Sequence, residues 1–217
     1  MGAVLRLPEG ISYEEGVLIE PFACCIRGLM KCRVNPGDRV LVIGAGPVGL
    51  MHVHLLKTFG AGTVIASDLI NSRLQTALKL GANYVANPKR DDLPRYVQDL
   101  TDGVGPDLVV VAVGSSKAIQ QGMDIVRKGG TVCVFGMPPP GDMLTYDASK
   151  IFIREISIVP SYSTSELETN MALKLMSAKR IEATQLITHR FKLEQIKDAL
   201  NYASEKKDSL KIIVTST

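Results

Sequence analysis

The sequence lacks the features that mark several large classes of protein. Its apolar runs are only as long as a β-strand and are interrupted by Gly and Pro, so none could span a bilayer. The net charge is +3 and the basic pairs are scattered, which argues against a nucleic-acid surface. The first ten residues lack the basic-then-apolar order of a secretion signal. We therefore expect neither a membrane nor a nucleic-acid partner.

Cysteine is scarce and not arranged for metal binding. The four cysteines show no C-x-x-C spacing, which predicts a reduced protein of the cytoplasm: Cys24, Cys25, Cys32 and Cys133. The chain has no Trp, and its composition of 46% hydrophobic, 22% charged and 5% aromatic residues is ordinary for a globular protein. Its 217 residues suffice for one large domain, or for one domain with part of another.

The middle of the chain alternates short β-branched runs with amphipathic stretches. The pattern predicts strands at residues 39–43, 63–67, 84–86, 107–113 and 130–135, and helices at residues 47–59, 71–80, 91–100 and 117–126. Continuous apolar strands between helices indicate a parallel sheet covered on both faces. Right-handed crossovers then give an α/β fold with a doubly wound parallel sheet, the Rossmann arrangement.

The two ends do not continue this alternation. A helix-like run covers residues 12–32, and the C-terminal part predicts a helix at 166–177, a strand near 186–187, a helix near 193–203 and a strand at 211–214. We expect residues 23–160 to form the nucleotide domain. Residues 1–22 and 161–217 would then belong to a second, incomplete domain.

A glycine-rich turn lies between the first predicted strand and helix. Gly44-Ala45-Gly46-Pro47-Val48-Gly49 fits G-x-G-x-x-G, in which the glycines permit a tight turn, approach of a pyrophosphate and close helix packing. The helix start offers N–H groups and a positive dipole end to phosphates, and Pro47 suits the first helical turn. The turn therefore predicts a dinucleotide site that uses Gly44, Gly46, Pro47, Val48 and Gly49.

An acid follows the second strand at the spacing this site requires. Asp68 lies about 20 residues beyond the turn, where a carboxylate binds the adenosine ribose hydroxyls and repels a 2′-phosphate. Arg73 lies close in sequence and could instead pair with that phosphate or stack on adenine. We predict NAD rather than NADP.

Several ordered motifs together resemble a known family. These motifs are the Glu20-Pro21 helix, the Pro36-Gly37-Asp38 turn, the glycine-rich turn and the later Ser67-Asp68 and Leu186–Phe191 segments. Together they resemble the zinc-dependent medium-chain dehydrogenases, and most of all their polyol (sorbitol) and threonine dehydrogenase branch. In that family a GroES-like catalytic domain precedes the nucleotide domain, and the chain returns to it at the end. The resemblance implies that this chain lacks most of the catalytic domain and binds cofactor without turnover on its own.

The resemblance also assigns roles to individual residues. Glu20 matches a carboxylate that contacts the catalytic zinc directly or through water, although the other ligands are absent and we expect no zinc in this chain. In the intact enzyme, zinc would bind the substrate hydroxyl while hydride passes from a secondary alcohol to NAD. The remaining implied cofactor contacts are Val113 on the adenosine side, and Phe135, Gly136, Met137, Ser161, Tyr162 and Ser163 on the nicotinamide side. Sorbitol dehydrogenases tend to carry Arg in place of Ser163, and this departure argues against sorbitol itself, so the resemblance leaves the substrate open. The resemblance also implies a homo-oligomer.

Two alternatives stay open at this point. Tyr146 and Lys150 form a Tyr-x-x-x-Lys pair, the catalytic pair of short-chain dehydrogenases, in which Lys lowers the pKa of the Tyr phenol. The Gly-x-Gly-x-x-Gly turn and the absence of an evident upstream catalytic Ser argue against this class. The chain could also be a dinucleotide-binding module without catalysis.

Overall fold

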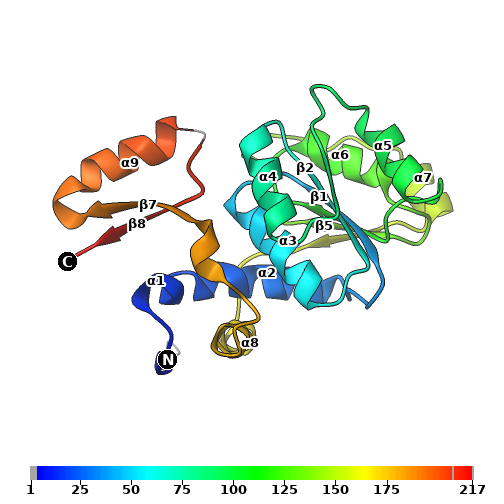
Figure 1. Cartoon of the computed structure of the whole chain (residues 1–217). Coiled ribbons are helices and arrows are strands. Elements are labelled where there is room, and N and C mark those ends of the chain that lie inside the picture. The colour runs from blue at the N-terminus through cyan, green and yellow to red at the C-terminus, as the bar shows by residue number, and fades with distance from the viewer. Residues whose placement is uncertain (1–3, 207, 217) are drawn as a thin grey trace.

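The computed structural model describes residues 4–206 and 208–216, and its centre is a six-stranded parallel sheet (Figure 1). The strand order is β3-β2-β1-β4-β5-β6, the doubly wound order that the alternation predicted. The strands are β1 Arg39–Ile43, β2 Thr63–Ser67, β3 Tyr84–Ala86, β4 Leu108–Val111, β5 Thr131–Val134 and β6 Ser157–Pro160. The connecting helices are α3 Pro47–Thr58, α4 Asn71–Lys79, α5 Leu93–Leu100, α6 Ser116–Ile125 and α7 Ala148–Arg154.

Both faces of the sheet are buried, which explains its uninterrupted apolar strands. Along β1, Val40 and Val42 face one core, which also contains apolar residues of α3. Leu41 and Ile43 face a second core, which is completed by α5 and α6. Successive side chains of a strand point to opposite faces, so two cores require every position to be apolar.

The sixth strand and the helix before it do not stand out in the sequence pattern. β6 lies at the edge of the sheet, and Ser157, Ile158 and Pro160 are exposed. A strand that is buried on neither face has no strong apolar pattern to mark it. It is fixed instead by its pairing with β5, in which Cys133 is in register with Val159.

The helix-like run near the N-terminus is two helices rather than one, α1 Tyr13–Gly16 and α2 Ile19–Lys31. Pro21 accounts for the break, since it has no N–H to donate to Val17 and its ring clashes with that carbonyl in a continuous helix. Pro21 is tolerated where it lies because the first turn of a helix leaves N–H groups unpaired.

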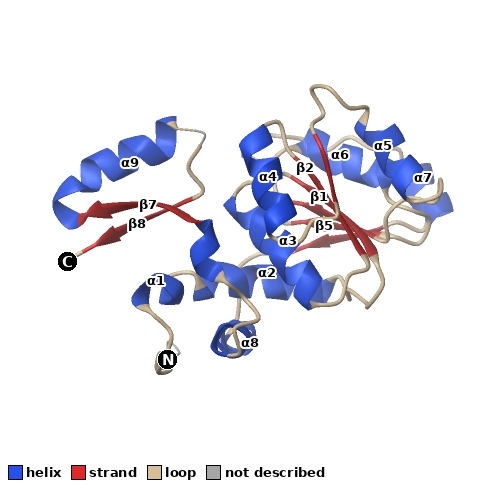
Figure 2. Ribbon diagram, in the orientation of Figure 1, coloured by secondary structure: helices blue, strands red, loops and turns tan. Residues whose placement is uncertain are grey.

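The C-terminal part forms a separate small lobe, which Figure 2 shows beside the main sheet. After α8 Glu166–Ser177, a short 3₁₀ turn leads to strand β7 Ile187–Lys192. Helix α9 Ile196–Glu205 connects β7 to strand β8 Lys211–Thr215, and the two strands pair in parallel. Arg190 of β7 forms a two-pronged ion pair with Glu14 of α1, with both N–O distances 2.7 Å. This ion pair therefore joins the N-terminal helix α1 to the C-terminal lobe. None of the helices described is both long and apolar enough to cross a membrane.

Candidate dinucleotide-binding site

The turn between β1 and α3 lies at the carboxyl ends of the parallel strands, where doubly wound sheets bind ligands. Gly44 has a φ of +95°, and a Cβ there would lie 2.4 Å from Cγ1 of Val113. At Gly49 a Cβ would lie 1.7 Å from the carbonyl oxygen of Gly44. The fold itself thus requires glycine at both positions.

Gly46 is different, because nothing inside the protein requires it to be glycine. Its φ of −67° and ψ of −177° suit any residue. The nearest atom to an added Cβ is Nη1 of Arg73, at 3.8 Å, an ordinary contact distance. A glycine that neither backbone conformation nor internal packing requires indicates that a ligand approaches the backbone at this point.

The start of α3 is also open to an anion. Gly46 is the N-cap and has no side chain, Pro47 is the first helical residue, and within the described residues no side chain caps this end. The first turn holds no acidic residue. A helix N-terminus in this state favours phosphate through its N–H groups and its dipole.

Asp68, directly after β2, braces the glycine turn as well as facing the crevice. Its Oδ2 accepts the Ala45 N–H at 2.7 Å, and its Oδ1 accepts the Ile70 N–H at 2.8 Å. The sequence suggested only a sugar-binding role, because a contact that spans 23 residues has no local signature. Each carboxylate oxygen retains a second lone pair that can accept a ribose hydroxyl.

A cavity of about 620 Å³ opens beside Asp68, large enough for an adenosine group. Its wall combines apolar side chains with a few polar ones, as small-molecule sites do. The residues that line it are Ile43, Gly44, Ser67, Asp68, Leu69, Ile70, Arg73, Pro88, Lys89, Val113 and Gln121.

The ends of β4 and β5 pack backbone against backbone next to the glycine turn. A Cβ at Gly136 would lie 2.3 Å from the carbonyl carbon of Val113, and one at Gly114 would lie 2.1 Å from the Met137 oxygen. The N–H groups of Phe135 and Gly136 both donate to the Val111 oxygen, at 3.1 and 2.9 Å. The N–H groups of Phe135 and Gly136 are therefore already used, and a ligand could contact their backbone only through the carbonyl oxygens. Met137, the next residue, is 77% exposed.

The Phe135 side chain turns into the core instead of the crevice. It meets His52 of α3 edge-on, with 4.5 Å between ring centroids. His52 is fully buried, and its Nδ1 lies 3.0 Å from the Val48 oxygen. Burial lowers the pKa of His52 to about 4, so the ring is neutral and serves the core.

The residues Ser161, Tyr162 and Ser163 follow β6 and reach the same end of the sheet. The Ser161 N–H donates to the Val134 oxygen at 3.1 Å, which places it beside the end of β5. Its hydroxyl oxygen is buried and has no hydrogen-bond partner among the described residues. Tyr162 is 85% exposed, and Ser163 has a left-handed φ of +63°.

Glu20, in the first turn of α2, lies next to the thiol of Cys24. The Cys24 Sγ donates to Glu20 Oε1 at 3.1 Å, and burial together with this carboxylate raises the pKa of Cys24 to about 12. Across the described residues, no three His, Cys, Asp or Glu side chains converge on one point. The residues present therefore do not fit a zinc ion by themselves.

Tyr146 and Lys150 lie away from the glycine turn, toward the opposite end of the strands. The Tyr146 hydroxyl donates to Asp124 in the last turn of α6, at 2.9 Å, whereas the crevice adjoins the first turn of that helix. Lys150 Nζ lies 5.9 Å from the centroid of the Tyr146 ring. Burial and Asp124 raise the pKa of Tyr146, the opposite of what a short-chain catalytic tyrosine needs.

Comparison with known proteins agrees with this fold. Residues 47–200 match the model of a family described as zinc-binding dehydrogenase. The chain belongs to this family. It is 32% identical over 212 residues to the sorbitol dehydrogenase of Bacillus subtilis, covering 97% of this chain and 60% of that protein.

Solved structures of dehydrogenases share the fold. An alcohol dehydrogenase of Thermus sp. ATN1 superposes with a TM-score of 0.92 at 28% identity, covering 98% of this chain and 61% of its own. A zinc-binding dehydrogenase of Sinorhizobium meliloti 1021, solved with NADP bound, has a TM-score of 0.90 at 25% identity and covers 97% of this chain and 61% of its own. The chain thus spans about 60% of the length of the relatives it matches.

Proposed function

We propose that the crevice at the carboxyl ends of the strands binds NAD, and that the chain is the cofactor-binding part of an alcohol or polyol dehydrogenase. The observation that carries the proposal is Gly46, which is glycine although neither its backbone angles nor its neighbours require it. An uncapped helix start beside it and a cavity of about 620 Å³ beyond it supply room and charge complementarity for a dinucleotide.

The residues divide by the part of the cofactor that each would hold. The turn would hold the pyrophosphate, the wall beside Asp68 the adenosine, and the ends of β5 and β6 the nicotinamide. The pyrophosphate residues would be Gly44, Gly46, Pro47, Val48 and Gly49. The adenosine residues would be Asp68, Arg73 and Val113. The nicotinamide residues would be Phe135, Gly136, Met137, Ser161, Tyr162 and Ser163. When bound, the nicotinamide supplies the hydride acceptor.

The choice of NAD over NADP rests on Asp68. Its carboxylate lies between the Ala45 and Ile70 N–H groups and lines the adenosine cavity, where a second negative charge would be repelled. Arg73 and Lys89 line the same cavity and could offset that repulsion. We assign NAD because the carboxylate is fixed by two hydrogen bonds and cannot turn away from a 2′-phosphate.

The intact protein, in this proposal, transfers hydride from a secondary alcohol, and its catalytic zinc is held mainly by residues outside this chain. Glu20 would contribute a carboxylate to that site. The chain alone would bind cofactor without turnover, because no complete metal site exists among its described residues.

The test is a titration of the 217-residue chain with NADH, NADPH and ADP-ribose. Nicotinamide fluorescence follows the first two ligands and calorimetry follows all three. We expect saturable binding of NADH and ADP-ribose and weaker binding of NADPH. Absence of binding to all three ligands would refute the cofactor assignment. Turnover of a secondary alcohol that survives chelation and requires Tyr146 would favour the short-chain alternative.

We also propose that the chain associates with a second copy through the β6 edge. Among the described residues no strand pairs with the outer side of β6, and the adjoining α7 presents Phe152 at 84% and Ile153 at 68% exposure. Large apolar side chains grouped beside an open strand edge favour association. Two copies of β6 could pair and extend the sheet, which would cover both features at once.

A further inference from the structure

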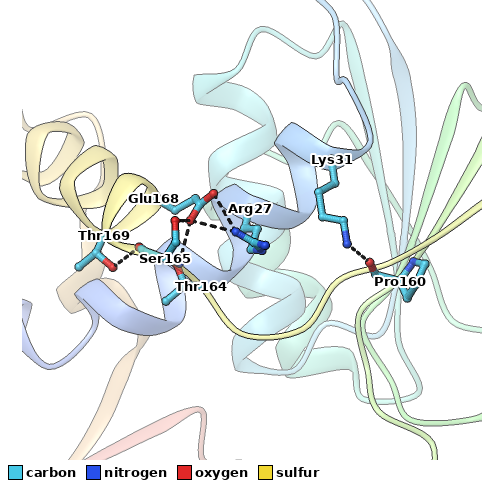
Figure 3. Close-up of polar contacts among 7 residues, drawn as sticks. All are labelled: Arg27, Lys31, Pro160, Thr164, Ser165, Glu168 and Thr169. Atoms are coloured by element: carbon cyan, nitrogen blue, oxygen red, sulfur yellow. Dashed lines mark hydrogen bonds and ion pairs between the residues drawn. The ribbon is translucent and has the colours of Figure 1, made fainter. Parts of the chain in front are cut away.

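Two cations on α2 hold the connection between β6 and α8, as Figure 3 shows. Arg27 and Lys31 are one helical turn apart and therefore lie on the same face of α2. Lys31 Nζ donates to the carbonyl oxygen of Pro160, the last residue of β6. Arg27 Nη1 lies 3.2 and 3.4 Å from the two carboxylate oxygens of Glu168, in the first turn of α8.

The Arg27 contact ends on a group that is itself fixed. Glu168 is only 5% exposed, and its Oε2 accepts the Ser165 N–H at 2.8 Å and the Ser165 hydroxyl at 2.5 Å. This capping box sets where α8 begins. Because the Glu168 carboxylate is buried, moving it away from Arg27 would leave a buried charge without this partner, so the pair opposes displacement of the start of α8.

The stretch between these two anchors has little to fix it locally. Ser161 donates its N–H to Val134, but among the described residues no hydrogen bond uses the N–H groups of Tyr162 and Ser163. Ser163 adopts φ +63° although it is not glycine. A backbone in this conformation persists only when the surrounding structure holds it there, and such residues are concentrated at functional sites.

We infer that Arg27 and Lys31 are positioning residues, which hold residues 161–163 where they meet the nicotinamide half of the cofactor. The inference rests on the proposed function. It adds that this half of the site is set by α2, a helix that lies outside the strand–helix alternation of the sheet. The adenosine half depends instead on Asp68 and the glycine turn, which neither cation contacts.

This division gives a test in which a purely structural role has a different outcome. Lys31→Met removes the donor to Pro160, Lys31→Arg retains a donor, and Lys174→Met makes the same charge change on the exposed side of α8. For Lys31→Met we expect the Kd for NADH to rise roughly five- to tenfold, which is less than loss of a charge-assisted hydrogen bond to the ligand itself would cause, because Lys31 acts only through residues 161–163. The Kd for ADP-ribose, which lacks the nicotinamide, should stay within about twofold. Lys31→Arg should restore NADH binding, and Lys174→Met should bind both ligands normally.

A second measurement needs no ligand. Chymotrypsin cleavage after Tyr162, identified by mass, should be faster in Lys31→Met than in the wild type or the two control variants. Equal losses of NADH and ADP-ribose affinity, or unchanged affinity for both with unchanged cleavage, would overturn the inference while leaving the cofactor assignment intact. If the wild type bound neither ligand, the proposed function would fail and the inference with it.

Discussion

Replacing Gly46 by Ala tests whether this glycine exists for a ligand or for the fold. The added methyl group lies 3.8 Å from its nearest neighbour, Arg73 Nη1, so packing does not oppose it. Alanine caps a helix less well than glycine, by up to about 1 kcal/mol, but it also lowers the entropy of the unfolded chain by about 0.4–1 kcal/mol. These two effects nearly cancel. The melting temperature should therefore change by no more than about 4 °C.

Cofactor binding should respond very differently. The methyl group would occupy the space in which the pyrophosphate approaches the turn, and one or more charge-assisted hydrogen bonds to backbone N–H groups would be lost. Each such bond contributes about 1.5–3 kcal/mol. We therefore expect the Kd for NADH to rise about 10- to 150-fold, measured by nicotinamide fluorescence.

Gly49→Ala is the matched control. Its methyl group would lie 1.7 Å from the Gly44 oxygen, so the helix must move and the free energy of unfolding should fall by about 1–3 kcal/mol or more. Thermal unfolding followed by circular dichroism separates the two variants. If Gly46→Ala bound NADH with normal affinity, or unfolded as easily as Gly49→Ala, the reasoning would be wrong.

Three further predictions concern other parts of the chain. Asp68→Asn removes the charge and keeps an acceptor for the Ala45 N–H, although its NH2 group cannot accept the Ile70 N–H. The ratio of NADPH to NADH affinity should rise about tenfold in parallel titrations, and an unchanged ratio would exclude a role in cofactor choice. The pKa of His52 is lowered to about 4, so between pH 6.5 and 4 the unfolded chain binds a proton at this residue that the folded chain does not. The free energy of unfolding is therefore highest above pH 6.5 and falls as the pH is lowered through this window, by up to about 1.4 kcal/mol per pH unit. Urea unfolding across that range should show a steeper loss of stability in the wild type than in His52→Leu, in which His54, whose pKa is also lowered by burial, still contributes. Phe152→Asp should shift the mass measured by light scattering from dimer to monomer without changing ADP-ribose affinity, whereas a wild type that is monomeric would contradict the β6 interface.

Much of the sheet could be predicted because its strands are buried on both faces. The β4 sequence is apolar at every position, and the structure buries all of Leu108–Val111. The glycine turn and Asp68 could be placed because their spacing along one crossover is fixed by the fold. The edge strand β6 gave no such signal, since its side chains are largely exposed.

The polar contacts that complete the candidate site could not be predicted. Arg27 and Glu168 are 141 residues apart, and no periodicity links them. The bond from Ala45 to Asp68 likewise forms only after two strands have paired. Such contacts depend on tertiary packing, so a pattern read along the chain suggests candidate ligand contacts but not the residues that hold those candidates in place.

The position of α2 explains why these supporting contacts matter for chemistry. One side of the helix packs on the start of α3, where Cys25 Sγ lies 3.9 Å from the Val48 oxygen and a Cβ at Gly28 would lie 3.2 Å from the Phe135 ring. Another side holds the chain between β6 and α8 through Arg27 and Lys31. Because Glu20 lies on this same helix, its distance from the glycine turn is set by contacts within the chain. In any reaction that uses both Glu20 and the glycine turn, the position of the substrate between them is therefore determined by the position of α2.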